Sequence, residues 1–157
     1  MRPGDTLLID SNLLVLLIVG TVALDYVGRH RRTKKYDADD YNLLMGFTTN
    51  YRAFMTTPHV LAETSNLLGS FRGSHLERSR RLLRERIEVW NEEEAPAKSV
   101  VQDEAFARLG LTDAGICQLV EDHIEVVTDD LDLYLELSRR GAVAHNFTHL
   151  QMQGVVD

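Results

Sequence analysis

Two short apolar runs, each followed at once by aspartate, constrain this chain more than any other feature of its sequence. Thr6–Ile9 (TLLI) precedes Asp10, and Ile124–Thr128 (IEVVT) precedes Asp129 and Asp130. Neither run alternates cleanly between apolar and polar residues, which is typical of strands buried on both faces in a parallel sheet. Because ligands bind outside the carboxyl ends of such strands, we expect these aspartates at a functional edge.

Helical patterns separate the expected strands. Residues 13–19 are a continuous apolar run that extends weakly to residue 24, and residues 13–24 are predicted to form a buried helix. A short helix is expected around 41–47. Thr57 and Pro58 are a typical helix start, and the apolar residues between Val60 and Phe71 fall on one face of the helix that follows. Helices are also expected at 74–90, 103–109 and 112–122, and short strands at 99–101 and 142–144.

The segment 130–138 (DLDLYLELS) alternates like a strand, but we assign it to a helix. Joined to IEVVT it would make one strand far longer than the usual five or six residues. Strands that alternate with helices imply an α/β fold, in which helices cover both faces of a central parallel sheet. The 157 residues are enough for one such three-layer α/β/α domain, with residues 26–56 as a polar, irregular insertion.

Four carboxylates come from four separate elements of this expected fold. Asp10 and Asp130 follow strands, Glu63 flanks the apolar face of its helix, and Asp113 lies in a first helical turn. A set of oxygen ligands suits Mg²⁺ or Mn²⁺ better than zinc or copper. The alternative is that these residues are ordinary helix-flank and capping charges, and the residues alone leave both readings open.

Five segments resemble, in this order, the successive motifs of the PIN-domain family. They are LLIDSNLL (7–14), TPHVLAETSNLL (57–68), RLGLTDAGI (108–116), VVTDDLDLYLEL (126–137) and GAVAHNF (141–147). The resemblance implies a metal-dependent ribonuclease, in which an acidic quartet binds Mg²⁺ or Mn²⁺ and a metal-activated water attacks RNA. Carried over by motif, the quartet is Asp10, Glu63, Asp113 and Asp130, with Asp130 chosen over Asp129 by motif register. Residues that position the quartet or the substrate would be Asn12, Thr128 and Asp132.

The resemblance also implies partners. Toxin components of toxin–antitoxin pairs belong to this family, so it implies a cognate antitoxin and a homodimer. The net charge of −7 argues at first against RNA, but residues 1–87 carry 13 basic and 9 acidic side chains, and residues 88–157 carry 4 and 15. The basic residues of the first half could track phosphates. The candidate RNA-binding residues are Arg29, Arg31, Arg32, Lys34, Lys35, Arg78 and Arg81.

Two other function classes stay open. A phosphatase or phosphoacceptor domain also gathers carboxylates at strand ends, but it usually adds a lysine near the site, and Lys34, Lys35 and Lys98 are not expected there. A non-catalytic RNA-binding or interaction module on the same fold would tolerate loss of the carboxylates. The single cysteine and the absence of a long apolar run predict a cytoplasmic protein without a membrane span.

Overall fold

A sheet of five parallel strands runs through the middle of the molecule in the order β3-β2-β1-β4-β5. A computed structural model describes residues 4–156. The strands are β1 (Thr6–Ile9), β2 (Ala53–Thr56), β3 (Asn91–Glu92), β4 (Ile124–Thr128) and β5 (Val143–Asn146).

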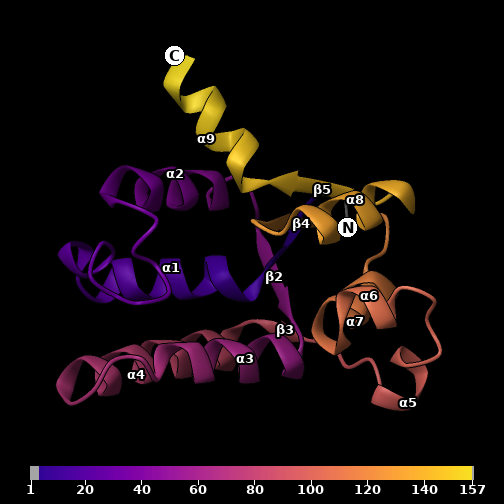
Figure 1. The fold of residues 1–157 in the computed structure, drawn as a ribbon, viewed down its shortest axis with the longest axis horizontal. Coiled ribbons are helices and arrows are strands. Elements are labelled where there is room, and N and C mark those ends of the chain that lie inside the picture. The colour runs from indigo at the N-terminus through magenta and orange to yellow at the C-terminus, as the bar shows by residue number, and fades with distance from the viewer. Residues whose placement is uncertain (1–3, 157) are drawn as a thin grey trace.

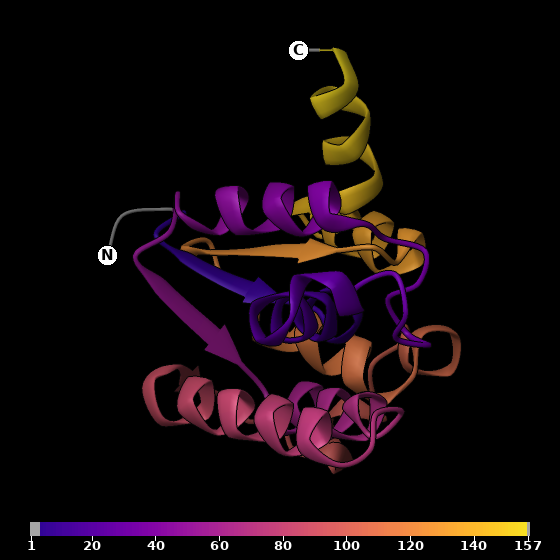
Figure 2. The same ribbon diagram turned by 90° about the vertical axis from the view of Figure 1, so that its left-hand side faces the viewer.

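Helices cover both faces of this sheet. In Figure 1, α1 to α4 lie on one side of the strands and α5 to α8 on the other, while Figure 2 shows α9 rising away from the body. The fold is therefore α/β with three layers, as predicted. The helices are α1 (Ser11–Val22), a 3₁₀ turn η1 (Leu24–Tyr26), α2 (Ala38–Thr48), α3 (Pro58–Leu68), α4 (Ser74–Val89), α5 (Ala97–Val100), α6 (Phe106–Leu109), α7 (Leu111–Leu119), α8 (Leu131–Arg139) and α9 (Phe147–Val156).

The core is built around α1. Nine of its twelve residues are buried, because α2, α3 and α4 all pack against it. At Gly20 the ring of Tyr41 from α2 lies where a Cβ atom would be, so only glycine fits this crossing. The Tyr41 hydroxyl then meets Thr21 Oγ1 at 2.7 Å. Asp10 caps the start of this largely apolar helix, so the packing of α1 fixes the position of that aspartate.

The predicted strands at 6–9 and 124–128 are confirmed to the residue, and the helix assigned to 130–138 is α8. The strand expected at 99–101 is wrong: α5 occupies that place, because Pro96 starts a helical turn that buries Val100 beside Ala114. Within the described residues, no helix is both long and apolar enough to cross a membrane.

Within residues 26–56, the helix expected around 41–47 is α2, whereas the end of the segment, which we expected to be irregular, forms the strand β2 beside β1. The first half is a series of turns ordered by four buried side chains spaced three residues apart. Val27, His30, Thr33 and Tyr36 are 1%, 1%, 0% and 6% exposed, whereas the residues between them are exposed. The Thr33 hydroxyl donates to the Val27 carbonyl at 2.7 Å. We call residues 27–36 the basic loop.

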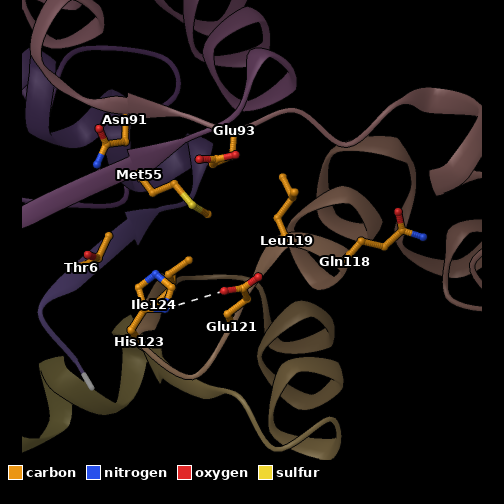
Figure 3. Close-up of a pocket in the computed structure, with 9 residues that line it drawn as sticks. All are labelled: Thr6, Met55, Asn91, Glu93, Gln118, Leu119, Glu121, His123 and Ile124. Atoms are coloured by element: carbon orange, nitrogen blue, oxygen red, sulfur yellow. Dashed lines mark ion pairs between the residues drawn. The ribbon is translucent and has the colours of Figure 1, made fainter. Parts of the chain in front are cut away.

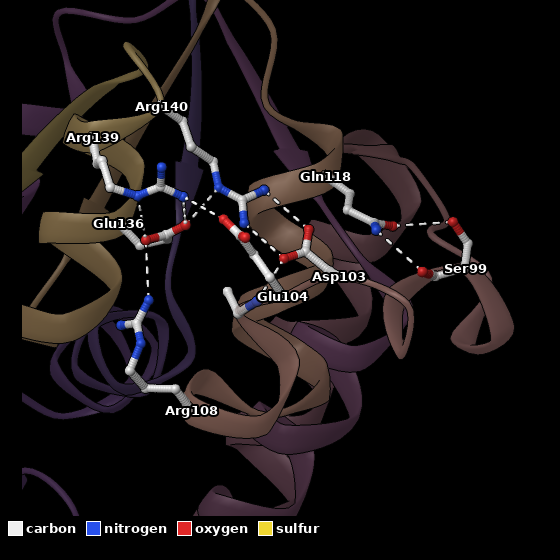
Figure 4. Close-up of polar contacts among 9 residues, drawn as sticks. Ser99, Asp103, Glu104, Arg108, Gln118, Glu136, Arg139 and Arg140 are labelled. Carbon is white, nitrogen blue, oxygen red and sulfur yellow. Dashed lines mark hydrogen bonds and ion pairs between the residues drawn. The ribbon is translucent and has the colours of Figure 1, made fainter.

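A network of ion pairs joins the short helices before α7 to α8 (Figure 4). Arg140 donates two hydrogen bonds to Asp103, at 3.0 and 2.7 Å, and a third to the buried Glu136 at 2.9 Å. Arg139 and Arg108 also bind Glu136, at 2.6 and 3.0 Å at the closest approach. The network holds the segment that leads into α7, and therefore the first turn of that helix, which contains Asp113.

Candidate metal centre

The carboxylates predicted from the sequence lie at the point where the strand order reverses. The chain builds β2 and β3 on one side of β1 and then places β4 and β5 on its other side. Asp10 follows β1 and Asp129 follows β4, and these strands are neighbours. The carboxyl edge at such a switch point is where open parallel sheets bind ligands.

Asp10 is held rigidly. It is 5% exposed, its Oδ1 accepts a hydrogen bond from the Ser11 amide at 2.7 Å, and its Oδ2 accepts one from the Thr128 hydroxyl at 2.6 Å. The same aspartate caps α1. Because Thr128 is the last residue of β4, this second bond ties the ends of β1 and β4 together. The role of Thr128 in positioning the site stays a prediction.

Glu63 and Asp113 approach the site from α3 and α7. Glu63 is exposed, and its Oε2 accepts a hydrogen bond from the Thr112 hydroxyl at 3.0 Å. Thr112 immediately precedes Asp113, so this bond places Glu63 beside the first turn of α7. Thr112 was not among the predicted site residues, although it is part of the LTDA motif.

Asp129 and Asp130 have different roles. The Asp129 side chain is 5% exposed and accepts hydrogen bonds from the Tyr36 hydroxyl at 2.8 Å and from Lys35 at 3.0 Å, with Asn12 Nδ2 at 3.4 Å. Asp130 instead caps α8 by accepting from the amide of Leu133. The choice of Asp130 as the ligand stays a prediction, because both aspartates lie at the site.

Electrostatics show how closely these carboxylates gather. Burial raises the pKa of Asp10 from 3.8 to about 6, and the charges of Asp129 and Glu63 add to this shift. Burial, followed by the charges of Asp10, Asp130, Glu63 and Asp129, raises the pKa of Asp113 from 3.8 to about 8. Five acidic groups therefore share one small region, and their proximity adds to the rise in the pKa of Asp113.

The chemistry of the donor set fits a hard divalent cation, since every candidate ligand is a carboxylate oxygen. As the side chains lie, however, no three histidine, cysteine, aspartate or glutamate residues among those described are arranged to ligate one ion. Hydrogen bonds direct Asp10, Glu63 and Asp129 toward protein partners instead. Binding a cation would require rotation of the exposed Glu63 or of Asp113.

The structure separates the other predicted residues. Asp132 is exposed in the first turn of α8, and no hydrogen bond or ion pair joins it to another residue of the described chain. Arg78 donates to the carbonyl of Val22 at 3.2 Å, so Arg78 and Arg81 lie at the far end of α1, ~18 Å along the helix from Asp10. Five candidates lie on the basic loop, all of them exposed: Arg29, Arg31, Arg32, Lys34 and Lys35.

Lys35 contradicts one expectation from the sequence. No lysine was expected near the carboxylates, yet Lys35 Nζ lies 3.0 Å from Asp129 Oδ2. Tyr36, which the sequence analysis missed, is buried beside it, and its pKa is raised by burial and by the charge of Asp129, so it remains a hydrogen-bond donor. The basic cluster was the only sequence feature that pointed to Lys35 and Tyr36. No local pattern links these two residues to Asp129, which is more than 90 positions away.

A separate hollow of about 260 Å³ lies between the sheet and the end of α7 (Figure 3). Glu121 and His123 line one side of it and lie 3.8 Å apart, between Oε2 and Nδ1. None of the predicted site carboxylates is among the described residues that line it, so it is distinct from the carboxylate cluster. Its lining consists of Thr6, Met55, Asn91, Glu93, Gln118, Leu119, Glu121, His123 and Ile124.

No protein-family model matches the chain, and no curated protein sequence matches it either. The resemblance to PIN domains is therefore carried only by the motifs described above. What the geometry adds is the common location of the residues that those motifs contribute.

Proposed function

We propose that the protein is a divalent-metal-dependent endoribonuclease of the PIN type, which hydrolyses phosphodiester bonds in RNA. The observation that carries the proposal is the gathering of Asp10, Glu63, Asp113, Asp129 and Asp130 at the switch point of the sheet. Such a cluster destabilises a protein unless a cation neutralises it, so its presence favours a cation-binding role.

The ligands would come from Asp10, Glu63, Asp113 and one of the two aspartates after β4. Mg²⁺ or Mn²⁺ bound there would polarise the phosphodiester and lower the pKa of the attacking water. As the water oxygen bonds to phosphorus, the bond from phosphorus to the leaving ribose oxygen breaks, and that oxygen takes up a proton. Thr128 and the Ser11 amide keep Asp10 oriented, and Asp113 would release its proton when the cation arrives.

The test combines RNA cleavage with metal binding. Labelled RNA is incubated with each protein in Mn²⁺ or in EDTA. The proteins are wild type, Asp10→Asn, Asp130→Asn and the control Asp122→Asn, which removes an exposed carboxylate just after α7. We expect cleavage only with Mn²⁺, and a loss of about 100-fold or more in both site variants but not in the control. Calorimetry in buffers of different ionisation enthalpy should show proton release on Mn²⁺ binding to wild type.

Cleavage that persists in EDTA, or that survives both site substitutions, would contradict the proposal. RNA binding without turnover would favour a non-catalytic RNA-binding module. The antitoxin and the homodimer stay predictions of the resemblance, which copurification and light scattering would test.

A metal-dependent phosphatase or phosphoacceptor is the second candidate, and the contact between Lys35 and Asp129 favours it. A lysine beside a strand-end aspartate can neutralise a phosphoryl group on that carboxylate. Turnover of p-nitrophenyl phosphate that is lost in Lys35→Gln, in a protein that leaves RNA intact, would establish this candidate instead.

A further inference from the structure

A polar hollow lies where the basic loop meets the end of α3. Its volume is about 370 Å³, and its lining comes from the basic loop, from α3 and from the turn after it. None of these residues belongs to the carboxylate cluster. We call this hollow the arginine pocket; it is lined by Arg31, Asn66, Gly69, Ser70 and Arg72.

The arginine pocket is strongly cationic. Arg31 and Arg72 line it from two different segments. Arg80 of α4 does not line the pocket but lies close to Gly69, since a Cβ atom on Gly69 would lie 3.9 Å from the Arg80 guanidinium. Within residues 4–156, no ion pair joins any of these three arginines to a carboxylate. Their charges are therefore available to an anion.

The chain holds the arginine pocket in a fixed position. His30 is 1% exposed, packs edge-on against Phe71 with ring centroids 4.1 Å apart, and accepts a hydrogen bond from the Arg32 amide at 3.1 Å. These contacts fasten the backbone on both sides of Arg31 to the end of α3. Asn66 and Ser70 add an amide and a hydroxyl, which are neutral donors suited to phosphate oxygens.

Two segments of the chain, α3 and the basic loop, contribute residues both to the arginine pocket and to the carboxylate cluster or its contacts. Along α3, Asn66 lies one turn beyond Glu63 on the same face, and Gly69 and Ser70 follow directly after the helix ends at Leu68. Along the basic loop, Arg31 is four residues before Lys35, which binds Asp129. An RNA strand that crosses the carboxylate cluster and follows α3 would bring one of its phosphates toward the arginine pocket.

We propose that the arginine pocket is a phosphate seat for the RNA strand, next to the bond that the carboxylate cluster cleaves. This inference rests on the proposed function, because it assumes that the ligand is RNA. Arg31 and Arg72 grip the phosphate oxygens, while Asn66 and Ser70 orient them. Arg78 and Arg81 lie at the far end of α1 and have no part in the seat.

The experiment measures binding of a short, fluorescein-labelled single-stranded RNA in EDTA, by anisotropy between about 50 and 200 mM salt. The test protein is the double variant Arg31→Gln/Arg72→Gln. Its matched control is Arg78→Gln/Arg81→Gln, which removes the same charge. We expect the test variant to bind about tenfold more weakly at low salt, and its salt slope to fall by about 0.7, the value for one phosphate on a single strand.

The control variant should keep both the affinity and the slope. Arg31→Lys/Arg72→Lys should recover part of the affinity but not all of it, because lysine keeps the charge but cannot donate the bidentate hydrogen bonds of a guanidinium. Melting temperatures check that each variant folds. Equal weakening in both glutamine variants would overturn the seat, since it would show only a general effect of charge.

The cleavage assay separates this proposal from the proposed function. RNA binding that requires Arg31 and Arg72, without Mn²⁺-dependent cleavage, would support the seat and reject the nuclease. Cleavage by the Arg31→Gln/Arg72→Gln variant with unchanged KM would reject the seat and keep the nuclease.

Discussion

The carboxylate cluster should make the metal-free protein less stable, and Asp113→Asn should relieve this. Asp113 has a pKa of about 8 in the folded chain and 3.8 as its usual value. A carboxyl whose pKa is raised by folding binds more protons in the folded state, so stability falls as pH rises from about 4 to about 8. The asparagine variant lacks this charge, and its advantage should grow over the same range.

The magnitude follows from the size of the shift. Four pKa units correspond to a ceiling of ~5.5 kcal/mol at pH 8. Asp113 is partly exposed and its neighbour Glu63 is exposed, so screening by water reduces this to ~2–3 kcal/mol. The variant also loses the favourable contact of a negative charge with the first turn of α7, worth ~0.3–1 kcal/mol. The net gain is about 2 kcal/mol, or ~4–8 °C in melting temperature for a chain of this length.

The assay is thermal unfolding in EDTA at pH 8 and pH 5, for wild type, Asp113→Asn and the control Asp122→Asn. Comparing the variants with wild type cancels the contributions of other titrating groups to the pH dependence of stability. One of these is His30: burial lowers its pKa, so its contribution to stability falls as the pH drops below 6.5, opposite to that of Asp113. We expect Asp113→Asn to melt higher than wild type at pH 8, by a margin that shrinks at pH 5. With Mn²⁺ the order should reverse, because the variant lacks a ligand. A variant that melts at or below wild type at pH 8 in EDTA would refute the reasoning.

Two further predictions concern contacts that support the site. Thr128→Val removes the 2.6 Å bond to Asp10; it should lower the free energy of unfolding by ~1–3 kcal/mol in urea titrations and weaken Mn²⁺ binding by about 10–100-fold in calorimetry. The arginines hold the pKa of Asp103 and of Glu136 down at about 2, through hydrogen bonds from Arg140 to Asp103 and from Arg139 and Arg140 to Glu136. Because folding lowers these two pKa values, the stabilisation from Asp103 and Glu136 is present above pH ~4 and is lost as pH falls toward 2. The variant Arg140→Met should therefore unfold with less sensitivity to acid. Unchanged acid unfolding in that variant would show that the network contributes little to stability.

The sequence predicted the parts of the fold that have a local signature. β1 and β4 are short apolar runs with an aspartate at the end, and α3 begins with Thr57 as cap and Pro58 in the first turn. The acidic residues of these elements meet because parallel strands share one carboxyl edge, so the general location of the site also followed. The strand predicted at 99–101 was wrong, and α5 occupies that place. A run of three residues with two valines is too short to distinguish a strand from a helical turn.

Other parts depend on contacts that no local pattern reveals. β3 consists of the exposed residues Asn91 and Glu92, and it is a strand only because β2 lies beside it. The contacts of Lys35 and Tyr36 with Asp129 join residues 94 and 93 positions apart. They arise because the buried side chains of the basic loop press it against the sheet edge, and a polar segment without periodicity gives no indication of such burial.

The spacing of buried side chains in the basic loop bears on the entropy of ligand binding. A flexible basic arm would lose conformational freedom when it closed on a polyanion, at ~1–2 kcal/mol for each backbone residue fixed. In this chain that loss accompanies folding, because Val27, His30, Thr33 and Tyr36 anchor the loop in the core. The basic side chains between these anchors are already presented at fixed points, so association leaves mainly side-chain freedom to be lost.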